Sequence, residues 1–153
     1  MKNKAKILVV LLIAALVFGG WCFDSLRVRE FAVEVVSVSP DPGIADGQTP
    51  VTVRLRVTRS GEPCADHVLC GITQDGGSFK AKRVTTDENG EAEFVYYPYL
   101  KSKINALTDV RLSFSDESNS LFIAVPARAE YVLPMVEAKD GDDPGKTNEG
   151  MFG

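Results

Sequence analysis

The chain has 153 residues, 44% of them hydrophobic and 25% charged, which suits one globular domain once the ends are set aside. Lys2, Lys4 and Lys6 precede an apolar run, and no acidic residue occurs before Asp24. From Asp24 onward 14 basic residues face 21 acidic ones, a formal charge of −7, and this argues against nucleic acid, which needs a clustered basic surface.

The first predicted element is an N-terminal apolar helix. Residues 7–18 read ILVVLLIAALVF, and the apolar run extends to Phe23. A lysine-rich start with twelve strongly apolar residues is typical of a cleaved secretory signal peptide. The whole run of seventeen residues, at about 1.5 Å each, covers about 25 Å, just short of a ~30 Å hydrocarbon core. Both interpretations place the rest of the chain outside the cytoplasm.

We favour an uncleaved anchor at residues 1–23 over a cleaved leader. The small-residue cleavage pattern near Gly19 is poor, and Trp21 stands before Cys22, where a lipoprotein would need a small residue. The lysines before the segment predict a cytoplasmic N-terminus and an extracytoplasmic C-terminal domain, which would be secreted if the leader were removed. Residues 24–30, DSLRVRE, form a short polar connector in this interpretation.

From Phe31 the sequence changes to a period of two. In residues 51–58 four aliphatic residues alternate with threonine and arginine, the pattern of a half-buried strand, and residues 92–97 and 110–114 repeat it. Seven or eight short strands in residues 31–136 predict an all-β, antiparallel sandwich. The weaker candidate strands are residues 32–38, 67–72, 79–84, 121–125 and 131–134.

The segments between the strands carry turn signals. Asp87, Asn89 and Gly90 predict a tight hairpin turn, because Asn-Gly tolerates positive φ. Residues 99–107 could form one or two helical turns. Residues 137–153 are polar, rich in glycine and acid, and too poor in apolar residues to pack, so we expect a disordered tail.

Four stretches between Ala45 and Tyr97 resemble the bacterial immunoglobulin-like (Ig-like) domains of group 1, the invasin and intimin type. The resemblance extends over Val33 to Val125 and implies a single Ig-like β-sandwich, a rigid spacer or display module at the cell envelope. It brings no catalytic residues, and a fold alone assigns no function. The four stretches are residues 45–47, the alternating strand 51–57, the turn 61–63 with the strand after it, and TTDENGEAEF at 85–94.

Cys64 and Cys70 lie six residues apart in a part of the chain where thiols would oxidise. A disulfide would need their Cα atoms within about 7 Å, so the chain between them would have to bend back. Two free, buried cysteines are the other interpretation. With His67 they form C-x2-H-x2-C, but a structural zinc needs a fourth ligand, so we expect no metal and no cofactor.

His67 is the only histidine, and nothing resembling a nucleophile elbow accompanies it, so we expect a surface histidine and no enzyme. Alternation turns Tyr97, and with it Tyr99, outward as a candidate contact patch, since exposed tyrosines suit binding surfaces. They could equally cap the end of the sandwich.

The sequence therefore predicts a non-enzymatic, membrane-tethered, extracytoplasmic Ig-like module, a structural or accessory part of a cell-envelope protein assembly. Its partner would be another envelope protein, met by a sheet edge or by the tyrosines. The alternative is an adhesion-related carbohydrate- or cell-wall-binding module that contacts polysaccharide through exposed aromatic rings.

Overall fold

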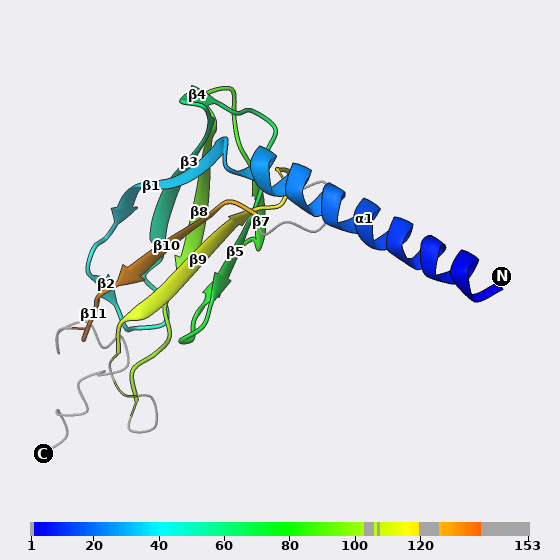
Figure 1. Cartoon of the computed structure of the whole chain (residues 1–153). Helices are drawn as coiled ribbons and strands as arrows, with labels where there is room; N and C mark the ends of the chain where they lie inside the picture. The colour runs from blue at the N-terminus through cyan, green and yellow to red at the C-terminus, as the bar shows by residue number, and fades with distance from the viewer. Residues whose placement is uncertain (1, 103–105, 107, 120–125, 139–153) are drawn as a thin grey trace, which may run out of the picture.

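A computed structural model of the chain describes residues 2–102, 106, 108–119 and 126–138. Helix α1 (Lys2–Val28) projects from one end of a β-sandwich (Figure 1). The strands lie in antiparallel sheets apart from one short parallel pair, and this confirms the all-β, Ig-like fold class with an N-terminal apolar helix.

The first sheet has the strand order β1–β3–β8–β6, with β4 paired to the end of β3. The second has the order β10–β9–β5–β7. The short parallel pair, β2 with β11, lies at the end of the sandwich away from α1 (Figure 1). The strands are β1 (Phe31–Ser39), β2 (Gly43–Ile44), β3 (Val51–Arg59), β4 (Glu62–Pro63), β5 (Val68–Thr73), β6 (Ser78–Phe79), β7 (Arg83–Thr85), β8 (Glu91–Tyr97), β9 (Val110–Asp116), β10 (Arg128–Leu133) and β11 (Met135–Val136).

The core lies between the inner faces of the two larger sheets. Alternate residues of β3, β8 and β9 are fully buried, as the period-two pattern predicts. Phe79, Phe94 and Phe114 meet at the centre, with ring centroids 5.2 to 5.6 Å apart. Burying one such side chain contributes about 1.5–3 kcal/mol, so these three rings are a substantial part of the core's stabilisation.

The prediction of one continuous strand at residues 79–84 is wrong. The chain forms two short strands there, β6 in the first sheet and β7 in the second, because it crosses between the sheets. Phe79 stays in the aromatic core while the carbonyl of Lys82 accepts a hydrogen bond from the amide of Gly71 on β5. The predicted hairpin at residues 87–90 is wrong for the same reason, since β7 and β8 belong to different sheets.

The predicted connector at residues 24–30 is also wrong, because α1 continues through Val28 and only Arg29 and Glu30 separate it from β1. Residues 99–102 are not helical, and Leu100 instead forms a β-bridge with Asp46. The predicted strand at 121–125 and the predicted tail from residue 139 lie outside the described residues.

Candidate functional site

A dense cluster of polar contacts surrounds the loop of residues 64–67, at the end of the sandwich nearest α1. The Nδ1 atom of His67 lies 2.6 Å from Oδ2 of Asp116. The histidine ring packs on Phe31, the first residue of β1, with centroids 5.4 Å apart. The cluster therefore joins the second sheet to the strand that follows the helix.

Asp116 is the last residue of β9 and is fully buried. Its Oδ1 accepts a hydrogen bond from the amide of Ser118 at 2.9 Å, and its Oδ2 faces His67. A buried carboxylate needs such partners because desolvation strongly disfavours an unpaired charge. The histidine and the following turn supply them.

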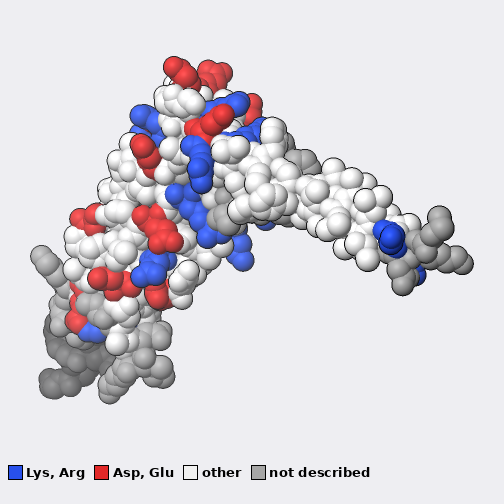
Figure 2. Space-filling view, viewed as in Figure 1, with Lys and Arg blue, Asp and Glu red and all other residues white. Residues whose placement is uncertain are grey.

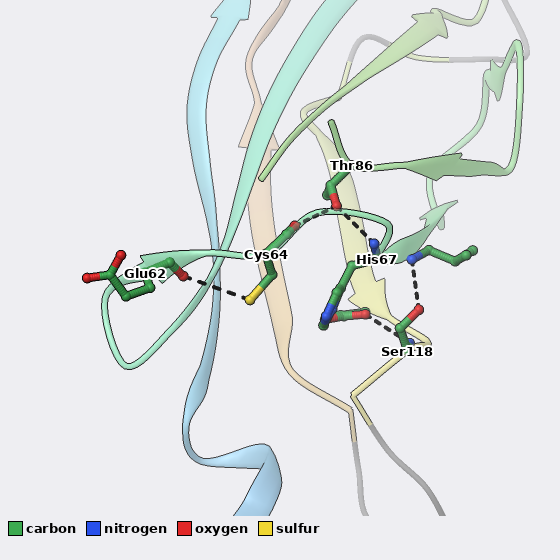
Figure 3. Close-up of polar contacts among 7 residues, drawn as sticks. Glu62, Cys64, His67, Thr86 and Ser118 are labelled. Carbon is green, nitrogen blue, oxygen red and sulfur yellow. Dashed lines mark hydrogen bonds and ion pairs between the residues drawn. The ribbon is translucent and has the colours of Figure 1, made fainter. Parts of the chain in front are cut away.

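Thr86 links the same loop to the end of β7. Its hydroxyl donates to the carbonyl of Cys64 at 2.7 Å and accepts from the amide of His67 at 2.9 Å (Figure 3). The Ser118 hydroxyl accepts from the amide of Val68 at 2.8 Å. Both hydroxyl groups satisfy backbone atoms of the loop, so each has a structural task here.

Cys64 and Cys70 are free thiols in the structure, and the considered disulfide is absent. The Cys64 thiol lies 3.8 Å from the carbonyl oxygen of Glu62, whereas Cys70 is on β5 opposite Arg83 and beside Glu117. The physical reason is that the 64–67 loop is tied to Thr86 and β3, so the two thiols have different neighbours.

Burial, reinforced by the negative charge of Asp116, raises the pKa of the Cys64 thiol. Burial, reinforced by Glu117, likewise raises the pKa of the Cys70 thiol. A cysteine nucleophile needs a lowered pKa, because the thiolate is the reactive form. Cys64, His67 and Asp116 thus resemble a Cys-His-Asp set in composition only. The raised pKa of the Cys64 thiol opposes that chemistry.

The turn at residues 87–90 is built by its first and last residues. The Asp87 carboxylate accepts from the amides of Asn89 and Glu91, both at 2.9 Å, and these hydrogen bonds lower the pKa of Asp87. Gly90 has φ +71°, and its carbonyl accepts from the amide of Val57 at 2.8 Å. The turn thereby carries the chain from β7 to β8 against the end of β3.

The two tyrosines of the candidate contact patch have different surroundings. Tyr97 is half-buried on the outer face of β8, opposite Ser78 of β6. Tyr99 packs against the core, and its hydroxyl both accepts from the amide of Thr108 at 2.8 Å and donates to the Thr108 carbonyl at 2.9 Å. The structure therefore leaves Tyr97, rather than Tyr99, as the ring that a ligand could use.

A shallow hollow of about 160 Å³ lies on the outer face of the second sheet. Serines on β9 form its floor between taller side chains on β5 and β10. No aromatic ring is exposed in it, so it lacks the stacking platform that a sugar ring would use. Its lining residues are Ile72, Gln74, Ser113, Phe114, Ser115, Arg128 and Glu130, of which Phe114 is buried.

Within the described part of the chain, no group of three or more His, Cys, Asp or Glu residues is placed to hold a metal ion. Sequence reasoning missed the contact of His67 with Asp116. A usable signal was present, because the inward positions 110, 112 and 114 of β9 lead directly to Asp116 as the next inward residue.

No known protein family matches the sequence, and no curated protein is significantly similar to it. Solved structures do match. The D0-D1 domain of intimin aligns with TM-score 0.50 and 16% identity, covering 68% of this chain and 48% of that one. A C-terminal 282-residue fragment of intimin, in complex with the intimin-binding domain of its translocated receptor, aligns with TM-score 0.50 and 18% identity over 66% of this chain and 32% of that one.

A conjugative transposon lipoprotein from Bacteroides eggerthii DSM 20697 aligns with TM-score 0.43 and 16% identity, over 68% of this chain and 96% of that one. The chain thus spans less than half the length of the two intimin structures. At these identities the comparisons report on architecture. The sandwich has the fold of the bacterial Ig-like domains of the invasin and intimin type.

Proposed function

We propose that this protein is a non-enzymatic, membrane-tethered Ig-like module that serves as a structural or accessory part of a cell-envelope assembly. The observation that carries the proposal is the length and the exposed apolar surface of α1. The helical segment Lys4–Val28 is long enough to cross a bilayer, an 18-residue window within it has a mean hydropathy of 2.4, and its large apolar side chains are exposed. Such a surface is stable only when something apolar covers it.

The charge distribution supports the same proposal. No charged residue lies between Lys6 and Asp24, and in Figure 2 the exposed helix is white between its basic start and the sandwich. Red and blue residues intermingle over the sandwich in this view. A segment embedded in lipid next to a domain in water requires this separation of an uncharged helix from a charged domain surface. The lysines at the start favour a cytoplasmic N-terminus, so the sandwich would lie outside.

The absence of catalysis is part of the proposal. The His67 cluster uses its hydroxyl groups and its carboxylate to hold a loop, and the pKa of its thiol is raised. A rigid module that positions or supports another envelope protein needs none of these groups for chemistry. The hypothesis therefore assigns them to stability.

The first experiment tests the tether. Membranes from cells that express the full chain are washed at high salt and alkaline pH, and the intact mass of the extracted protein is measured. We expect the protein to stay with the membrane and to keep residues 1–23. Release by the wash, or a mass that lacks the leader, would contradict a retained anchor.

The second experiment separates a protein partner from polysaccharide, the alternative ligand. After detergent extraction, a stoichiometric protein partner would support the envelope assembly. Retention on purified wall polysaccharide that is lost in Tyr97→Ala, but kept in Val95→Ala on the same face of β8, would instead support the alternative. Tyr99→Ala is a poor probe because it also removes the anchor of Thr108.

A further inference from the structure

The exposed apolar surface of α1 is longer than the apolar run in the sequence. That run ends at Phe23, because Asp24 follows it. In the structure Asp24 is fully buried by the protein itself, while Phe23 and Leu26 are 59% and 66% exposed. The charged residue that ends the apolar run in the sequence therefore does not interrupt the apolar surface of the helix.

The helical geometry explains how this happens. Asp24 and Val28 lie four residues apart on one face of α1, and both are at least partly covered. Phe23 and Leu26 lie on the opposite face, so the last turns are apolar on their exposed side. From Ile7 to Leu26 the helix has twenty residues at about 1.5 Å each, or about 30 Å, which equals the usual hydrocarbon thickness.

The junction with the sandwich is short and tied down. Glu30 donates its amide to the carbonyl of Arg27 at 3.1 Å, and its own carbonyl accepts from the amide of Ser60 at 2.8 Å. Arg59 pairs with the Glu30 carboxylate at 2.8 Å and stacks over the ring of Phe31, with 5.5 Å from the guanidinium carbon to the ring centroid. The end of the sandwich is thereby held beside the last helical turn.

We propose that the lipid bilayer reaches Leu26 on the exposed side of α1, so that the part of the protein that covers Asp24 is held at the membrane surface instead of standing clear on a connector. Arg27 and Arg29 follow Leu26, and arginine side chains at a helix end extend to lipid head groups. Trp21, 45% exposed, then lies below the head groups within the outer part of the hydrocarbon region. This inference rests on the proposed anchoring and adds the depth at which the domain sits.

The chain has a single tryptophan, so depth can be read from fluorescence. The full chain is reconstituted in phosphatidylcholine vesicles whose acyl chains are brominated near the head group, since bromine quenches only tryptophan that it touches. Three proteins are compared: the wild type with Trp21, the double variant W21F/L26W, and W21F/V132W. Val132 is exposed on β10 and serves as the matched control in water.

We expect the wild type and W21F/L26W to lose most of their emission in brominated vesicles and to be blue-shifted, while W21F/V132W loses none. If W21F/L26W matches W21F/V132W while Trp21 is quenched, the anchor holds and the proposed depth is wrong. If Trp21 is also unquenched, the anchor itself is wrong. Each result thus separates the depth from the tether.

Discussion

His67 and Asp116 are 49 positions apart in the chain, and their side chains meet at 2.6 Å across the end of the second sheet. Asp116 is fully buried, whereas the side chain of His67 is 18% exposed. The His67 ring thus lies between the buried Asp116 carboxylate and solvent. It also packs on Phe31, so the contact connects the sheet to the strand that leaves the helix.

Removing the histidine should therefore be costly. We expect His67→Ala to lower the free energy of unfolding by about 1–3 kcal/mol, because it leaves a buried oxygen of Asp116 without this hydrogen-bond partner. His67→Asn is the matched control, since its amide can donate from nearly the position of Nδ1. Urea unfolding of both variants is the measurement. Equal and small losses in the two variants would mean that the contact contributes little.

Gly90 should tolerate alanine less well than another glycine of positive φ. An added Cβ at Gly90 would lie 2.6 Å from the carbonyl oxygen of Val57, whereas at Gly61, with φ +90°, nothing lies within 4 Å. Gly61→Ala therefore carries only the conformational cost of about 1–2 kcal/mol, and Gly90→Ala should cost more because backbone must move. Thermal unfolding compares the two, and an equal shift in Tm would contradict the close packing of this turn.

Acid should weaken the loop at residues 46–49. Burial alone would raise the pKa of Asp46, but the hydroxyl and amide of Thr49 and the amide of Gln48 donate to its carboxylate, and on balance they lower the pKa below 3.8. Because the folded-state pKa is the lower one, this stabilisation is present above pH 3.8 and is lost as the pH falls through the folded value. Asp46→Asn should reduce the fall in unfolding free energy over that range. If Asp46→Asn leaves the pH dependence of the unfolding free energy unchanged, Asp46 does not contribute to the acid sensitivity of this loop.

The three cysteines should all be alkylated once the protein is denatured without reductant. In the folded protein Cys64 and Cys70 should react slowly at neutral pH, because burial raises the pKa of each thiol. Intact mass after alkylation is the measurement. A protein that takes label on Cys22 alone, even when denatured, would show that Cys64 and Cys70 pair after all.

Local pattern was enough for the long, alternating strands and not for the short strands or the connections. The alternation at residues 51–58 and 92–97 predicts β3 and β8 to within a residue, because one face of each is buried. The sheet change between Phe79 and Arg83 depends on the aromatic core and on pairing with β5, which are both distant in sequence. Turn chemistry alone cannot distinguish a hairpin from such a crossing.

The sequence predicts the existence of α1 and some residues of the candidate site, but neither the end of the helix nor the contacts within the site. The apolar run predicts the helix, but not its extension to Val28 or the burial of Asp24 inside the protein. For the site, composition raises His67 and the two cysteines as candidates. Only the fold brings Asp116 to His67 and separates Cys64 from Cys70.

The central claim is that α1 crosses a membrane and leaves the sandwich outside the cytoplasm. Fusing alkaline phosphatase, and in a separate strain green fluorescent protein, after Gly153 tests it directly, since the first is active only outside and the second fluoresces only inside. The account predicts that the phosphatase fusion is active and that the green fluorescent protein fusion does not fluoresce. Bright fluorescence with inactive phosphatase would contradict it.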